Sequence, residues 1–192
     1  MFYWFIKLIT YIPFAILFPC IIKGKKNIPK GRAVIICNHL SNIDYIYLFN
    51  NIWRKQFVLA KESLFKNRFI GKLFKLCCGI PINRDNPSIS SMKKCLEVLK
   101  KEKILTIFPE GTRNKKNLEL QEFKAGSSLF AIKTGAPIIP IVIKKRPHFF
   151  CFNKIIIGEP IYFDETYKGS DGVDRANDVI REKMEMLLKS KK

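Results

Sequence analysis

Short apolar runs alternate with segments of helical apolar spacing along most of this chain. Runs of Val, Ile and Leu between turn residues predict buried strands, and apolar residues recurring every three or four positions predict helices. Strands are expected at residues 31–37, 56–60, 80–83, 104–108, 138–143 and 154–157, and helices at 43–53, 64–76, 88–101, 122–134 and 172–189. This alternation predicts an α/β fold, a single domain with a mixed, largely parallel sheet flanked by helices.

Residues 1–22 depart from this alternation because nearly all of them are apolar. As one helix they would be roughly 33 Å long, just enough to cross a bilayer. Pro13 and Pro19 argue against a straight span, and Lys7 would have to reach the interface. A buried core helix would have no polar outer face, and a signal peptide would need a small-residue cleavage site. We therefore expect residues 1–22 to be a hydrophobic membrane-anchoring segment, spanning or half-inserted, before a folded domain at 23–192.

The net charge of the chain is +19, from 35 Lys and Arg against 16 Asp and Glu. Such an excess predicts an anionic partner, which could be nucleic acid, an anionic membrane surface or a phosphorylated substrate. No helix-turn-helix, zinc-finger or RRM-type motif supports nucleic acid. No acidic residue precedes Asp44, and a basic cluster at 23–26 directly follows the apolar segment. We expect this cluster to meet anionic head groups and the following domain to lie on the cytoplasmic side of a membrane.

The first block with chemical potential is Asn38-His39, which follows the strand at 31–37, with Asp44 five residues further on. A bend into the next helix could bring the Asp44 carboxylate to one imidazole nitrogen, leaving the other as a general base. An alternative explains two residues without catalysis, because Ser41 and Asp44 fit a capping box at a helix start. That alternative does not explain His39.

Three further blocks follow strand ends or lie within strands. Phe108-Pro109-Glu110-Gly111-Thr112-Arg113 offers a glycine turn and donors suited to a phosphate or carboxylate, although a turn with a surface ion pair between Glu110 and Arg113 would also explain it. A short strand that begins at Gly79 delivers Arg84. Pro140 stands inside an apolar strand, which favours an edge strand or a bulge. The six cysteines form no C-x-x-C pair, so buried reduced thiols are expected rather than a metal site.

Taken in this order, the blocks resemble those of the glycerolipid acyltransferase family, the group that contains the 1-acyl-sn-glycerol-3-phosphate acyltransferases. The resemblance covers residues 24–160 and includes a Phe-Lys-x-Gly stretch at 123–126. The matching positions are Asn38, His39, Asp44, Gly79, Arg84, all six residues 108–113, and Pro140. Residues 23–192 would accordingly be an acyltransferase domain.

The resemblance implies acyl transfer from an acyl thioester, acyl-CoA or acyl carrier protein, to the sn-2 hydroxyl of lysophosphatidic acid, which gives phosphatidic acid. His39 would be the general base and Asp44 would orient it. The acceptor would be bound by Arg84, Glu110, Gly111, Thr112 and Arg113, together with Lys61. No metal and no cofactor beyond the thioester co-substrate is expected, and the partner would be an anionic phospholipid membrane, not nucleic acid. Alternatives are a different acceptor, such as glycerol 3-phosphate or another lysolipid, or a basic membrane-surface or nucleic-acid-binding protein without catalysis.

Overall fold

The computed structural model describes residues 2–83, 86–115, 119–124 and 126–190. Their centre is a seven-stranded sheet with the order β1-β7-β6-β2-β5-β3-β4. All neighbouring strands are parallel except β6 and β7. The strands are β1 Cys20–Lys23, β2 Ala33–Cys37, β3 Gln56–Lys61, β4 Gly79–Ile82, β5 Ile104–Ile107, β6 Ile138–Ile143 and β7 Asn153–Ile157. The predicted α/β domain with a mixed, largely parallel sheet is confirmed.

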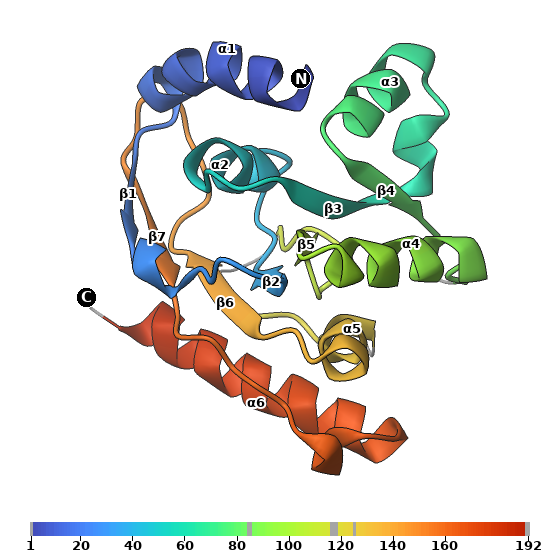
Figure 1. The fold of residues 1–192 in the computed structure, drawn as a ribbon. Helices are drawn as coiled ribbons and strands as arrows, with labels where there is room; N and C mark the ends of the chain where they lie inside the picture. Colours follow the sequence, from blue (N-terminus) through green and yellow to red (C-terminus); the bar gives the residue numbers. More distant parts are fainter. Residues whose placement is uncertain (1, 84–85, 116–118, 125, 191–192) are drawn as a thin grey trace.

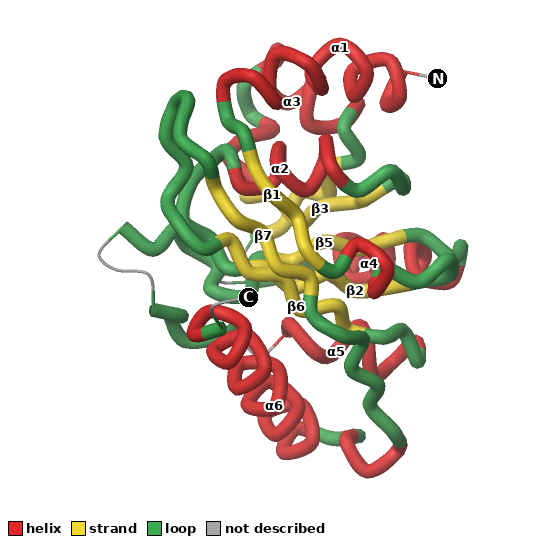
Figure 2. Tube along the Cα trace, turned by 90° about the vertical axis from the view of Figure 1, so that its left-hand side faces the viewer, coloured by secondary structure: helices red, strands yellow, loops and turns green. Residues whose placement is uncertain are grey.

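Helices cover both faces of this sheet (Figure 1). They are α1 Phe2–Leu17, α2 Asp44–Asn51, α3 Arg68–Leu76, α4 Ile89–Lys100, α5 Gly126–Thr134 and α6 Ser170–Lys189. One buried cluster joins α1 and α2 to the sheet, and a second joins α4, α5 and α6 to its other face. Figure 2, turned by 90° from Figure 1, shows α1 and α3 at the same end of the molecule, opposite α6.

The central strands form where the sequence is almost entirely apolar, with Thr106 as the one polar residue of β2, β5 and β6. Every residue of β2, β5 and β6 is buried, because helices cover both faces of the sheet there. The helix expected at 64–76 is divided. A short 3-10 turn, Glu62–Phe65, comes first, and α3 begins at Arg68 because the Asn67 side chain accepts hydrogen bonds from the backbone N–H groups of Phe69 and Ile70.

The structure does not support the predicted N-terminal membrane helix. Helix α1 has 16 residues, and no helix within the described ranges has both the length and the apolar character needed to cross a bilayer. Pro19 follows α1, and the backbone then extends as β1, which pairs in parallel with β7. Tyr3, Lys7 and Phe14 of α1 are buried. Residues 2–23 therefore form a packed helix followed by an edge strand. Hydropathy alone does not distinguish this arrangement from a single membrane helix.

Lys7 does not extend towards a water interface as expected. Its side chain is fully buried, and Nζ donates a hydrogen bond to the carbonyl oxygen of Ile52 at 2.5 Å. The rings of Trp4, Phe49 and Trp53 lie 5.1–5.5 Å from the ammonium group. Burial lowers the pKa of Lys7 to about 8. Lys7 thus holds α1 against the carboxyl end of α2, where the helix dipole favours a cation.

The basic cluster at 23–26 is also placed differently from the expectation. Strand β1 leads away from α1, and Lys25 and Lys26 follow at its far end (Figure 1). Four extended residues cover roughly 13 Å. The two lysines are exposed, but they do not lie beside the apolar helix that precedes them in the sequence.

Pro140 is not in an edge strand, because β6 lies between β7 and β2. The ladder between β6 and β7 begins at Ile141, which pairs with the last residue of β7, Ile157. The carbonyl of Pro140 accepts a hydrogen bond of 2.8 Å from the N–H of Gly158, one residue beyond that ladder. Antiparallel pairing resumes at the bridge between Ile138 and Ile161 with the register shifted by one residue, so the missing N–H of the proline falls at a bulge, as one of the two alternatives expected.

Candidate active site

The loop between β2 and α2 brings His39 and Asp44 together. Nδ1 of His39 lies 2.9 Å from Oδ2 of Asp44, and the Asp44 side chain is fully buried. The same oxygen accepts hydrogen bonds from the backbone N–H groups of Leu40 at 2.6 Å and Ser41 at 2.7 Å. An ionised carboxylate is an acceptor only, so this contact favours the tautomer of a neutral imidazole that has its proton on Nδ1 and its lone pair on Nε2. The pair has the geometry of an oriented general base.

The capping interpretation of Ser41 and Asp44 is compatible with this pair. Helix α2 begins at Asp44, whose carboxylate accepts from the N–H of Ser41, while Oγ of Ser41 accepts from the N–H of Ile43 at 3.3 Å. The carboxylate therefore binds the imidazole and the loop before the helix, but the expected capping box is formed only in part, because the N-cap position is Ile43, which makes no side-chain capping bond. The helix supplies a fixed support for the His39–Asp44 pair, and the positive end of its dipole favours the charged carboxylate.

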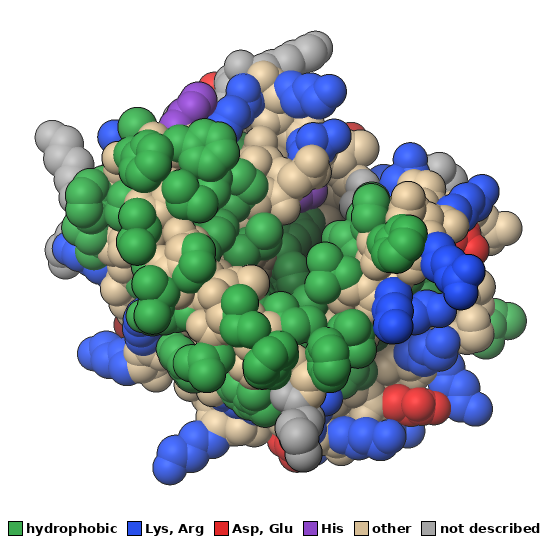
Figure 3. All heavy atoms as spheres, turned by 90° about the horizontal axis from the view of Figure 1, so that it is seen from above, with side chains coloured by type: hydrophobic (Ala, Val, Ile, Leu, Met, Phe, Trp, Pro, Cys, Tyr) green, Lys and Arg blue, Asp and Glu red, His purple; other side chains and the backbone are tan. Residues whose placement is uncertain are grey.

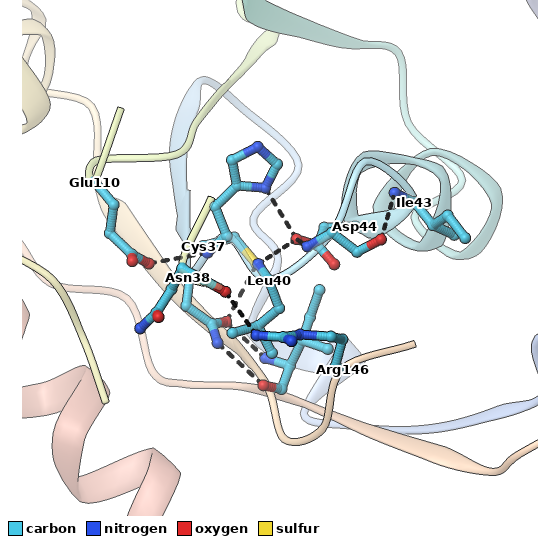
Figure 4. A network of polar contacts seen from close by, with 11 residues as sticks. Cys37, Asn38, Leu40, Ile43, Asp44, Glu110 and Arg146 are labelled. Atoms are coloured by element: carbon cyan, nitrogen blue, oxygen red, sulfur yellow. Dashed lines mark hydrogen bonds and ion pairs between the residues drawn. The ribbon is translucent and has the colours of Figure 1, made fainter. Parts of the chain in front are cut away.

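Hydrogen bonds to the end of β6 and to the loop after β5 fix the backbone around His39 (Figure 4). The buried Asn38 amide accepts from the N–H of Ile143 at 2.8 Å and donates to its carbonyl at 3.0 Å. The N–H of His39 donates to Oε1 of Glu110 at 2.9 Å, and its carbonyl accepts from the N–H of Asn114 at 2.7 Å. The ends of β2, β5 and β6 are thereby joined around the histidine.

Glu110 is a buried residue, with 5% of its surface exposed. Burial raises the pKa of its carboxyl group above the ordinary value, opposed by hydrogen bonds from backbone N–H groups. Oε2 has no hydrogen-bond partner among the described residues. The next residue, Gly111, has a φ of +65°, and a Cβ there would lie 3.0 Å from the side chain of Lys124. The glycine thus permits both the turn and the close approach of that lysine.

The remaining predicted site residues are dispersed. Thr112 and Arg113 lie on the exposed side of the same turn, and Thr112 donates to the Gln121 side chain at 3.1 Å. No ion pair joins Glu110 and Arg113 in the part of the chain that the structure describes. Lys61 ends β3 and is exposed. Arg84 lies outside the described residues.

An apolar cavity of about 430 Å³ opens beside His39, between α1, α2, β3 and α3. The ring of Phe108 packs against the imidazole with centroids 4.4 Å apart, and His39, Phe108 and Lys61 all line the cavity. Its apolar walls include Ile6, Ile46, Phe49, Val58, Leu64, Leu73 and Phe74. Figure 3 shows this face of the molecule hollowed between hydrophobic side chains. The cavity lies between α1, three consecutive elements and Phe108 after β5, so it depends on how these parts pack and no local sequence signal pointed to it.

A second, larger hollow of about 1350 Å³ lies on the α4 and α5 side of Phe108. Glu110 and Gly111 belong to its lining, as do Phe123 and Lys124. Two residues that sequence reasoning did not single out support the loop between these hollows. Asn114 binds the His39 carbonyl, and Arg146 donates to the Asn114 carbonyl at 2.9 Å (Figure 4). Within the described ranges, no three His, Cys, Asp or Glu side chains are grouped so that they could hold a metal ion.

Comparison with known proteins identifies a family and several relatives. The sequence profile of the family described as Acyltransferase matches residues 20–144. The 1-acyl-sn-glycerol-3-phosphate acyltransferase of Bacillus subtilis (strain 168) is 34% identical over 146 residues, which cover 72% of each chain. The enzyme of the same name from Borreliella burgdorferi is 33% identical over 138 residues, which are 70% of this chain and 55% of that protein.

A solved structure shows the same fold. The crystal structure of the 1-acyl-sn-glycerophosphate (LPA) acyltransferase PlsC from Thermotoga maritima superposes with a TM-score of 0.67, covering 90% of this chain and 73% of that one, at 23% sequence identity. The four motif blocks, the extent of the profile match and the identity to the Bacillus subtilis enzyme lead to one assignment. This chain is a member of the acyltransferase family.

Proposed function

We propose that this protein transfers an acyl group from an acyl thioester to the sn-2 hydroxyl of lysophosphatidic acid, forming phosphatidic acid. The names of its relatives support this acceptor. The observation that carries the proposal is the His39–Asp44 pair at the wall of an apolar cavity. One imidazole nitrogen is held by a buried carboxylate, and an aromatic ring fixes the plane of the imidazole.

In the proposed reaction, Nε2 of His39 takes the proton of the acceptor hydroxyl as its oxygen attacks the thioester carbonyl carbon. The tetrahedral intermediate then collapses, the carbon–sulfur bond breaks, and the leaving sulfur receives the proton from the imidazolium. Asp44 stabilises the imidazolium through Nδ1. Base catalysis of this kind contributes about 10²–10⁴ to a rate. The products are the ester and a free thiol, and no acyl-enzyme is formed.

The acceptor phosphate would be bound by cations near the same edge of the sheet. Arg113 and Thr112 are exposed on the turn after β5, and Lys61 lines the cavity beside His39. We expect Arg84 to contribute as well. Glu110 has one carboxylate oxygen on the His39 N–H and leaves Oε2 for a donor group of the substrate. Guanidinium groups suit this task because their paired N–H groups match phosphate oxygens.

The apolar cavity is suited to an acyl chain next to the reacting ester. Its volume falls within the usual range for ligand sites, and its walls are mostly aliphatic and aromatic. The donor would be acyl-CoA or acyl carrier protein. The enzyme would work at an anionic membrane surface, with its catalytic domain on the cytoplasmic side and the apolar outer face of α1 half-inserted. That outer face exposes Phe2, Phe5, Leu8, Ile9, Ile12 and Ile16.

The test uses purified protein in detergent, with the thiol release measured for each pair of donor and acceptor. Acyl-CoA and acyl carrier protein are each combined with lysophosphatidic acid, glycerol 3-phosphate and a neutral lysolipid. We expect turnover that requires lysophosphatidic acid. Equal turnover with the other acceptors would contradict the proposed acceptor.

The same assay tests the base with a matched pair of variants. His39→Ala should abolish turnover and leave the circular dichroism spectrum unchanged. His148→Ala replaces the other histidine of the chain, which is exposed on the β6–β7 connection, and should leave turnover unchanged. Full activity in His39→Ala would refute the assignment of the base.

A further inference from the structure

Helix α3 carries an apolar face that no other part of the described structure covers. Phe69 is 85% exposed, Leu73 is 51% exposed and Ile70 is 45% exposed. Gly71 is the one buried residue among the nine of this helix. Helices of globular proteins normally turn their apolar stripe towards the core. The outward stripe of α3 therefore needs a different explanation from core packing.

The helix is nevertheless held firmly in place. Asn67 caps its first turn, and a Cβ on Gly71 would lie 2.6 Å from the carbonyl oxygen of Phe65. The close approach at Gly71 seats the helix on the preceding 3-10 turn. Its exposed stripe is therefore a fixed feature of the surface and not the result of a loosely attached segment.

The charged residues from Lys66 to the end of α3 are all basic. Lys66, Arg68, Lys72 and Lys75 are exposed on or just before α3. The sequence has no acidic residue between Glu62 and Asp85. A short helix with exposed aromatic and aliphatic residues on one side and lysine or arginine beside them is the type that lies in the interface of an anionic bilayer.

We propose that α3 is a docking helix for an anionic lipid bilayer, lying in the plane of the head groups with Phe69 and Ile70 inserted. The proposal deepens the proposed function, on which it rests, because it states how the enzyme meets its lipid substrate. A second copy of this chain is a poorer occupant, since the cations of one α3 would face those of another.

The position of α3 agrees with a bilayer as the occupant. Helices α1 and α3 lie at the same end of the molecule, where hydrophobic side chains gather with Lys and Arg at their edge (Figures 1 and 3). Ile6 of α1 and Leu73 of α3 both line the cavity beside His39. A bilayer that contacts both helices would thus adjoin the cavity, and a lipid could enter it without crossing water.

Charge reversal tests the proposal with the full-length protein and vesicles of phosphatidylglycerol and phosphatidylcholine. The double variant Arg68→Glu with Lys72→Glu lowers the net charge from +19 to +15, as does the control Lys93→Glu with Lys94→Glu on α4. All four residues are exposed. In co-sedimentation we expect the α3 variant to bind about tenfold or more weakly, because each cation at the surface contributes strongly. Equal weakening by both variants would show a response to overall charge and would overturn the proposal.

A second pair of variants tests the apolar contact. Phe69→Ser on α3 and Ile89→Ser on α4 remove side chains that are 85% and 87% exposed, so neither should alter the fold. Phe69→Ser should weaken vesicle binding about tenfold, as expected for an aromatic side chain withdrawn from an apolar phase. An unchanged affinity would overturn the proposal. The proposal would also be overturned if the wild type formed a dimer in gel filtration and Phe69→Ser dissociated it.

Turnover in detergent keeps the two proposals separate. The α3 variants should retain wild-type turnover on detergent-solubilised substrate, because their side chains do not contact the reacting atoms. If the wild type shows no turnover but its vesicle binding depends on α3, the proposed function is refuted and the proposed docking role of α3 is retained. If the wild type shows turnover but the α3 variants bind vesicles as the wild type does, only the proposed docking role of α3 is refuted.

Discussion

The substitution Asp44→Asn separates the two roles of this carboxylate. Oδ2 of Asp44 accepts from His39 Nδ1, Leu40 N–H and Ser41 N–H, while Oδ1 is buried without a hydrogen-bond partner in the described residues. Asparagine has nearly the same shape but no charge. If its oxygen faces the three donors, its amide group occupies the position of Oδ1 and finds no acceptor.

Two free-energy costs follow from this geometry. The unsatisfied buried amide destabilises the fold by about 1–3 kcal/mol, and the loss of charge weakens hydrogen bonds that are each worth about 1.5–3 kcal/mol. We expect a free energy of unfolding lower by about 2–4 kcal/mol, within the range of these terms. The imidazolium formed in the reaction also loses its counter-charge, so kcat should fall about 10²-fold or more while KM changes little.

The assay combines thiol release with thermal unfolding of the same preparations. Asp171→Asn is the control, because Asp171 is also an aspartate in the first turn of a helix but is exposed and makes no contact with a histidine. The control should alter neither property. A fall in stability with kcat retained in Asp44→Asn would mean that Asp44 is a helix cap only and would refute the catalytic pairing.

Three further predictions concern buried polar groups. The free energy of unfolding should rise with pH between about 8 and the ordinary lysine pKa of 10.5, because burial lowers the pKa of Lys7 and the unfolded chain binds more protons in this range. Denaturant unfolding of Lys7→Met should lack this rise, and an identical rise would contradict the prediction. Because burial raises the pKa of Glu110, the wild type should lose stability as the pH rises through that pKa. Glu110→Gln keeps an acceptor for the His39 N–H and should remove this loss, which urea unfolding at several pH values would show. Asn38→Ala leaves the Ile143 N–H and carbonyl unpaired and should cost about 2–4 kcal/mol of unfolding free energy, whereas a cost below about 1 kcal/mol would show that water replaces the amide.

The sequence predicted the parts of the fold that are uniform over several residues. The runs at 33–37, 104–107 and 138–143 are buried throughout, so their continuous hydrophobicity was a direct signal of interior strands. Strand β1 was missed because its four residues continue the apolar composition of α1. Pro19 marked the boundary, but a proline predicts a kink as readily as an end.

The contact between His39 and Asp44 could be predicted because the two residues are five positions apart and follow a strand. The contact between the His39 N–H and Glu110 spans 71 positions, and that between Lys7 and Ile52 spans 45. Neither leaves a local signal. The cavity beside His39 and the outward face of α3 depend on how four separate elements pack, so both became apparent only from the structure.

The strand order has a consequence for how the protein behaves at high concentration. The two edges of the sheet are β1 and β4, each four residues long. Pro81 interrupts the hydrogen-bond donors of β4, and β1 ends at the exposed Lys23. Short edge strands with a proline or a lysine resist pairing with strands of another molecule. We therefore expect any aggregation of the native enzyme to be relieved by detergent, which covers apolar side chains, rather than by changes to the sheet edges.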